Sequence, residues 1–125
     1  MRKIKFRAWT DKGGMITPCL WLDKYNHFVG EDYTNNQYGN VLDVMEFTGL
    51  HDKNGREIWQ GDIINGSIRG GKNVIIFDNE LAAFGYRYKT NWGLSFEFLY
   101  RNLEDIEIIG NIYENPDLLG VKKCL

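Results

Sequence analysis

The chain has little proline and little cysteine, and it has no long apolar run. Two prolines and two cysteines occur among its 125 residues. Cys19 and Cys124 lie far apart without CxxC spacing, so they indicate neither a disulfide framework nor a zinc site. No apolar run approaches the ~20 residues that cross a bilayer, and the charged start Met1–Arg7 runs straight into a strand pattern without the apolar core of a signal peptide. We therefore expect a cytoplasmic protein without membrane contact.

Recognisable catalytic patterns are also missing. His51 and Asp52, followed by Glu57 and Asp62, form the one cluster that resembles a metal or acid–base site. However, neighbouring side chains of a strand face opposite sides, and zinc needs three or four converging ligands. Gly70-Gly71-Lys72 lacks the remainder of a phosphate loop. We expect no enzyme, no metal and no cofactor.

Aromatic residues, by contrast, are abundant. They make up 14% of a chain that also has 14 glycines, a composition that suits short strands joined by tight turns. The length is about that of one domain, and the apolar and charged fractions are those of ordinary globular proteins. The sequence therefore predicts a mainly β fold.

Short alternating runs, separated by turn residues, predict the individual strands. Asn54-Gly55 is a strong hairpin signal, and the β-branched run Val74–Phe77 is expected to be central in a sheet. Pro116 suits the start of a short terminal turn. So many strands at close spacing indicate a small barrel or a sandwich. The expected strands cover residues 4–9, 15–16, 41–48, 57–59, 63–64, 74–77, 84–88, 94–98 and 106–109.

Three blocks of the sequence carry a recognisable pattern: Met1–Trp9, the central Phe47–Ile63 with its spaced glycines, and Ile109–Pro116. Together they resemble the YopX family of small phage and prophage proteins. The resemblance implies an SH3-like barrel in the C-terminal part, an N-terminal part that serves in oligomer contacts, and a protein that works in the cytoplasm of a bacterial host. It transfers no catalytic residue.

The chain is accordingly expected to have two parts. Residues 1–40 would form an N-terminal β-hairpin and an irregular extension, in which residues 18–40 are a long loop. Residues 41–125 would form the SH3-like barrel with a C-terminal tail. Turn chemistry explains several residues of the central family block. The residues predicted to act as structural turns are Gly49, Asn54, Gly55, Gly61 and Asp62.

The leading functional hypothesis is a non-enzymatic phage accessory protein that binds protein, itself included. Residues 1–15 are basic and residues 97–118 are acidic, so these segments could pair within or between subunits. Trp and Tyr are enriched in interfaces. We expect a homo-oligomer, with a host or phage protein as a further candidate partner. The predicted interface residues are Trp9, Trp59, Ile112, Tyr113, Leu118 and Leu119.

The alternative hypothesis is a barrel that binds nucleic acid in phage DNA or RNA transactions. Aromatic and basic side chains crowd the run from residue 86 to residue 92, and such mixtures stack on bases and hold phosphates. The net charge of −2 weakens long-range attraction to phosphate. The residues predicted for this role are Tyr86, Arg87, Tyr88, Lys89 and Trp92.

Overall fold

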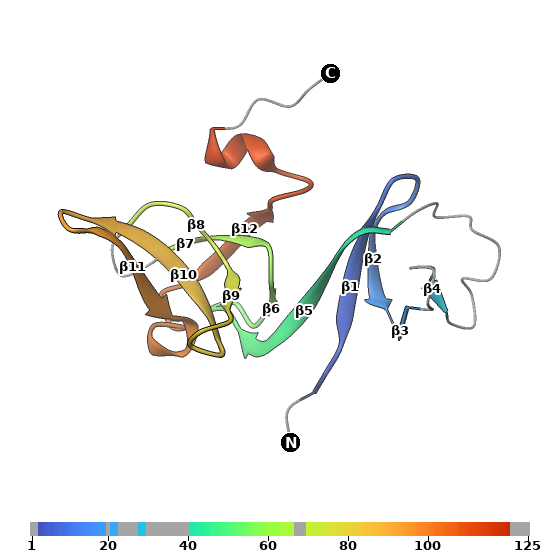
Figure 1. The fold of residues 1–125 in the computed structure, drawn as a ribbon, viewed down its shortest axis with the longest axis horizontal. Coiled ribbons are helices and arrows are strands. Elements are labelled where there is room, and N and C mark those ends of the chain that lie inside the picture. The colour runs from blue at the N-terminus through green and yellow to red at the C-terminus, as the bar shows by residue number, and fades with distance from the viewer. Residues whose placement is uncertain (1–2, 20, 23–27, 30–40, 67–69, 121–125) are drawn as a thin grey trace. The chain divides into compact units, whose positions relative to one another are not determined.

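In the computed structural model, antiparallel strands dominate both parts of the chain (Figure 1). The structure describes residues 3–19, 21–22, 28–29, 41–66 and 70–120. Most of the expected loop at residues 18–40 therefore lies outside the described residues. The chain divides into two compact units, Met1–Phe47 and Thr48–Leu125. Their boundary falls inside a strand rather than before it.

The first unit is a small antiparallel sheet. Its strands are β1 (Phe6–Thr10), β2 (Gly14–Cys19), the two-residue pair β3 (Trp21–Leu22) and β4 (Phe28–Val29), and the first part of β5 (Val41–His51). β1 lies between β2 and β5, with Ala8 opposite both Ile16 and Val44. Ala8 and Ile16 are buried, so alternation along β1 gives this unit a small apolar cluster.

The second unit contains two three-stranded antiparallel sheets, in the orders β11-β10-β9 and β12-β7-β8. The end of β5 pairs with the short strand β6. The elements that follow β5 are β6 (Glu57–Trp59), β7 (Asp62–Asn65), β8 (Asn73–Val74), β9 (Ile76–Asp78), β10 (Ala83–Thr90), β11 (Gly93–Phe98), β12 (Glu107–Asn111) and the 3-10 helices η1 (Leu99–Arg101) and η2 (Pro116–Leu119).

These curled sheets enclose one apolar core. Its members come from β6, β7, β10, η1 and β12 and from the segments that join strands, because each strand turns alternate side chains inward. This arrangement confirms the prediction of a mainly β chain with a small barrel-like C-terminal part. The buried members are Ile58, Ile64, Ile75, Phe84, Tyr86, Leu99, Ile106 and Ile108, with Leu50, Tyr88 and Leu103 packed against them.

The β-branched run at residues 74–77 differs from its prediction. It is not one central strand, because β8 and β9 are edge strands of different sheets. Ile75 lies between them and is fully buried. Its N–H donates to the Asp62 carbonyl at 2.9 Å, and its carbonyl accepts the Gly61 N–H at 2.8 Å. The prediction of a central strand is therefore wrong: β-branched residues indicate burial, but they do not say which neighbour a strand pairs with.

Candidate interaction surface

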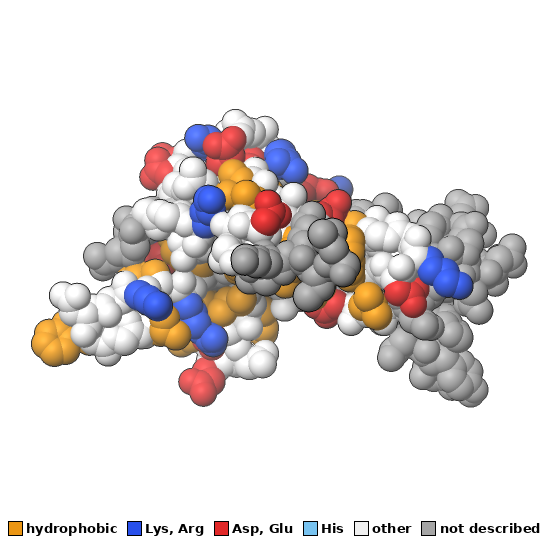
Figure 2. Space-filling view, turned by 90° about the horizontal axis from the view of Figure 1, so that it is seen from above, with side chains coloured by type: hydrophobic (Ala, Val, Ile, Leu, Met, Phe, Trp, Pro, Cys, Tyr) orange, Lys and Arg blue, Asp and Glu red, His pale blue; other side chains and the backbone are white. Residues whose placement is uncertain are grey.

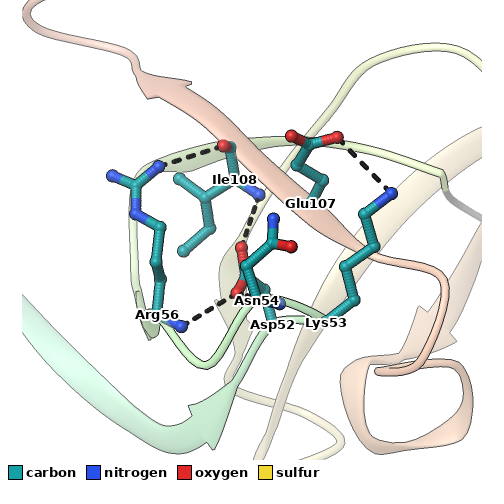
Figure 3. A network of polar contacts seen from close by, with 6 residues as sticks. All are labelled: Asp52, Lys53, Asn54, Arg56, Glu107 and Ile108. Carbon is teal, nitrogen blue, oxygen red and sulfur yellow. Dashed lines mark hydrogen bonds and ion pairs between the residues drawn. The ribbon is translucent and has the colours of Figure 1, made fainter.

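Asp52 links the turn between β5 and β6 to the distant strand β12 (Figure 3). Its Oδ1 accepts the backbone N–H groups of Asn54 and Arg56, each at 2.9 Å, and its Oδ2 accepts that of Ile108 at 3.0 Å. The Arg56 guanidinium in turn donates to the Ile108 carbonyl at 3.2 Å. Both carboxylate oxygens are thus occupied in holding the backbone.

The pKa of Asp52 reflects this role. Burial of the carboxyl raises its pKa, but the hydrogen bonds from Ile108, Arg56 and Asn54, together with the Arg56 charge, outweigh burial and lower the pKa below 3.8. A group that is held ionised by backbone donors is poorly suited to exchange protons with a substrate near neutral pH. The side chain is best explained as a structural tie.

The other residues of the sequence cluster around His51 do not converge on Asp52. Asp62 is buried, and its Oδ2 accepts the Trp59 N–H at 2.7 Å. His51 is exposed. Within the described ranges, no three His, Cys, Asp or Glu side chains lie close enough together to hold a metal ion.

The three glycines of the central family block have positive φ, but they do not all lie in turns: Gly55 and Gly61 lie between strands, whereas Gly49 lies inside β5, so its prediction as a turn residue is corrected. Gly49, Gly55 and Gly61 have φ values of 85°, 81° and 89°, a region that other residues rarely adopt. The N–H of Gly55 donates to the Asp52 carbonyl at 3.0 Å, and it closes the turn that contains Asn54. This block therefore shapes the backbone at the start of the second unit.

Asn111, which was not among the residues predicted from the sequence, organises the C-terminal turn. Its Oδ1 accepts the N–H groups of Tyr113 (3.0 Å) and Glu114 (2.9 Å), and its Nδ2 donates to the Glu114 carboxylate at 2.7 Å. The Asn115 side chain accepts the Asn111 N–H at 3.2 Å. The sequence did contain a signal for this role, because an Asn side chain tends to hydrogen-bond the backbone of the residue two positions later.

The predicted interface residues are unequally accessible. Trp9 lies partly buried in the first unit, and Ile112, Tyr113 and Leu118 are partly buried in the second, whereas Leu119 is exposed. Trp59 is only 5% exposed. The prediction for Trp59 is corrected, because a side chain buried within its own chain has almost no surface to offer a partner.

The hairpin of β10 and β11 carries the residues predicted for nucleic-acid contact. Its tight turn places Trp92 at the tip, where the side chain is 95% exposed. Arg87 lies opposite Phe96, and Lys89 lies opposite Leu94. Because directly opposed residues share a face, these two cations stand on the same side of the sheet as the side chains opposite them.

Tyr86 and Tyr88 lie on the other side of this sheet. Tyr86 is fully buried in the core. Its hydroxyl donates a hydrogen bond to the Asn102 side chain at 3.4 Å. Tyr88 packs partly buried against the same core. The nucleic-acid prediction for Tyr86 is therefore corrected: the alternation of β10 sends it inward, away from Arg87 and Lys89.

We name the outward side of the hairpin the hairpin face; it consists of Arg87, Lys89, Leu94, Phe96 and Phe98, and Tyr100 continues it on η1. The ring centroids of Phe96 and Phe98 lie 5.4 Å apart, and those of Phe98 and Tyr100 lie 5.7 Å apart. Leu94 is 69% exposed and Tyr100 is 61% exposed. At the left of Figure 2, where the hairpin turn lies in Figure 1, hydrophobic side chains stand on the surface beside cationic ones.

A glycine makes room for the central ring of this face. Gly85 lies opposite Phe98, and a Cβ on Gly85 would come within 2.5 Å of the Phe96 ring. Phe96 therefore lies across the backbone of β10. An aromatic ring that covers a strand glycine protects backbone that would otherwise be open to water.

The charges of the hairpin face are few. Arg87 pairs with Asp78 at 3.4 Å, whereas Lys89 has no ion-pair partner among the residues described. Near the tip, Lys89, Trp92 and Leu94 help to line an open concavity of about 670 Å³. The apolar side chains of the hairpin face therefore lie beside one cation, Lys89, that pairs with no acid among the described residues.

In the part of the chain that the structure describes, no helix is long and apolar enough to cross a membrane.

Comparisons with known proteins place the chain in a family. No curated protein matches the sequence. The chain is similar to the crystal structure of protein EF1440 from Enterococcus faecalis, with 26% identity and a TM-score of 0.51, over 95% of this chain and 99% of that chain. The model of the YopX protein family matches residues 5–120, and the chain therefore belongs to this family.

Proposed function

We propose that this YopX protein is a non-enzymatic protein-interaction module that associates with a second copy of itself through the hairpin face. The observation that carries the proposal is an apolar surface in which the partly buried rings of Phe96 and Phe98 lie between the exposed side chains of Leu94 and Tyr100, next to the exposed Trp92. Exposed apolar patches of this kind mark interaction sites, and aromatic residues supply most of the energy of interfaces.

The charge of the surface supports protein over nucleic acid as the partner. Affinity for nucleic acid grows with the number of phosphates that cations neutralise. Asp78 already balances Arg87, so Lys89 is the one cation of the hairpin face that has no ion pair among the described residues. A surface with several apolar side chains and one such cation favours an apolar protein interface.

The proposal extends to the biological setting. The family resemblance to small phage and prophage proteins supports an accessory role in the cytoplasm of a bacterial host, where a host or phage protein would be a second partner. A non-enzymatic role is supported by Asp52, whose carboxylate oxygens both accept backbone hydrogen bonds.

Light scattering of the full chain over a range of concentrations tests the proposal. We expect the wild type to self-associate and Leu94→Glu to weaken the association, because the new charge would be desolvated in an apolar contact. Leu42→Glu is the matched control, since Leu42 is an exposed leucine (60%) of the first unit. A monomeric wild type, or an equal loss with Leu42→Glu, would contradict the proposal.

The alternative function, nucleic-acid binding, is favoured by one specific observation. Lys89 and the exposed Trp92 line the same concavity, where a base could stack while the ammonium holds a phosphate. A fluorescent single-stranded oligonucleotide at low salt tests this alternative. Binding that physiological salt abolishes, and that Lys89→Ala weakens, would support it; no binding at low salt would exclude it.

A further inference from the structure

The outer edge of β11 lacks the devices that usually protect an edge strand. β11 ends its sheet, and its pairing with β10 runs without a bulge from Gly85 opposite Phe98 to Thr90 opposite Gly93. The strand contains neither proline nor lysine, and Glu97 is its one charge. Bulges, prolines and lysines are the features that normally stop such an edge from pairing with another chain.

The backbone groups on this edge can be identified from the turn. Thr90 and Gly93 flank a two-residue loop, so they form a hydrogen-bonded pair, and bonded and non-bonded pairs then alternate along the hairpin. The N–H and C=O groups of Leu94, Phe96 and Phe98 consequently point away from β10. Within the described ranges, no other backbone group bonds to these three residues.

We propose that a second copy of the chain supplies the missing partner by adding its own β11 antiparallel to this edge, with Phe96 on the two-fold axis. Phe96 then pairs with Phe96 of the second copy, and Leu94 pairs with Phe98. This inference rests on the proposed function, and it adds the contact, the symmetry and the register.

Hydrogen bonding and charge select the same register. Pairs between outward-pointing residues require shifts of two residues, because a shift of one would oppose bonded to non-bonded positions. A shift by two residues that pairs Leu94 with Phe96 of the second copy leaves Phe98 without a strand partner, and hydrogen bonds are lost. A shift by two in the other direction sets Glu97 opposite Glu97, and like charges in direct opposition are destabilising. In the proposed register Glu97 faces Ser95.

The side chains agree with this pairing. Leu94, Phe96 and Phe98 stand on one face of β11, so the two copies form a continuous apolar stripe flanked on each side by Arg87 and Lys89. Aromatic and aliphatic pairs directly opposite each other across antiparallel strands are favourable. The contact would cover Leu94, which is 69% exposed in the single chain.

A charge exchange at residue 96 tests the symmetry. Phe96→Lys and Phe96→Glu should each raise the dissociation constant of the dimer by about tenfold or more, because each sets like charges opposite each other at the axis. An equal mixture of the two variants should form a heterodimer, identified by its mass in native mass spectrometry. Leu81→Lys and Leu81→Glu are the matched pair, at an exposed leucine (49%) between β9 and β10 that lies outside the hairpin face, and their mixture should gain no preference for heterodimers.

A second variant guards against misfolding, since Phe96 also covers Gly85. Leu94→Lys alters an exposed side chain, and it should weaken the dimer by about tenfold while the circular dichroism spectrum stays unchanged. A wild-type dimer that both Leu94→Lys and the residue 96 variants leave intact would overturn the β11 contact and the hairpin face as its site, while self-association itself would stand. A monomeric wild type would overturn both. Failure of the mixed variants to form a heterodimer, after each alone has lost the dimer, would overturn the register.

Discussion

At the scale of single residues, Asp52 shows how one carboxylate can replace a missing strand contact. It reaches Ile108, 56 positions away in the sequence, and at the same time it fixes the turn at Asn54 and Arg56. Hydrogen bonds to an ionised group are stronger than neutral ones, and removal of the acceptor leaves buried donors without a partner. Much of the stability of this corner should depend on one ionised side chain.

Asp52→Asn should therefore destabilise the protein by about 2–3 kcal/mol at neutral pH. Because the folded pKa lies below the unfolded value, the carboxylate stabilises the fold above pH 3.8, and this contribution is lost as the pH falls through the folded pKa. Urea denaturation at several pH values measures both effects, and the variant should lose less stability than the wild type on acidification. Asp105→Asn, at an exposed position of the same unit, is the control; equal midpoints for the two variants would contradict the prediction.

Gly85 offers a second test at this scale. In Gly85→Ala the new methyl group would collide with the Glu97 carbonyl as well as with the Phe96 ring. The backbone carbonyl cannot move as a side chain can, so we expect a loss of about 1–3 kcal/mol in chemical denaturation. Adding Phe96→Ala should relieve the ring contact alone. An unchanged midpoint for Gly85→Ala would show that the hairpin can shift to admit a methyl group.

At the scale of elements, the C-terminal turn depends on Asn111. Asn111→Ala removes two acceptor contacts to backbone N–H groups and one donor contact to Glu114. We expect a loss of about 1–2 kcal/mol and faster proteolysis after residue 112, because the turn would open. Limited proteolysis with mass spectrometry measures the effect. Asn79→Ala, at an exposed position between β9 and β10, is the control, and this variant should be cleaved after residue 112 at the wild-type rate. Equal cleavage rates for the two variants would contradict the role of Asn111.

Local elements could be predicted from the sequence, whereas pairings between distant segments could not. The hairpin that joins β10 and β11 follows from two alternating runs around a short turn. By contrast, the passage of Ile75 from one sheet to another depends on backbone bonds to Asp62 and Gly61 that leave no local pattern. The link from Asp52 to Ile108 is hidden for the same reason.

The cationic residues of the hairpin face, but not its apolar residues, were predicted from the sequence. Arg87 and Lys89 were identified by type, but Leu94, Phe96 and Phe98 were not recognised as surface residues. The two-residue turn sets Lys89 opposite Leu94, so counting outward from it would have put the apolar residues beside the cations. The burial of Tyr86 follows from the same count.

At the scale of the whole molecule, salt distinguishes the two functional hypotheses. Self-association through the apolar hairpin face should change little between low and physiological salt, because screening acts on charges and this face has few. Phosphate binding should weaken steeply over the same range. Sedimentation velocity at both salt concentrations measures the difference, and a self-association that salt abolishes would contradict an apolar contact.

The second unit should fold without the first. Every member of its core cluster lies between residues 48 and 125, including the buried residues of both three-stranded sheets. We expect a fragment of residues 48–125 to show a cooperative thermal transition by circular dichroism. In that fragment Ile106→Ala should cost about 2–5 kcal/mol, since Ile106 is fully buried. A fragment without a cooperative transition would show that its core needs the first unit.

The bare edge of β11 has a consequence for how far assembly can proceed. A contact across a two-fold axis consumes the same edge on both copies, so it leaves no β11 free to recruit a third chain. The opposite edge of the sheet, β9, is only three residues long and includes the ion-paired Asp78. Pairing through β11 is therefore self-limiting, and it converts a strand that would invite open-ended fibre growth into one that closes after a single encounter.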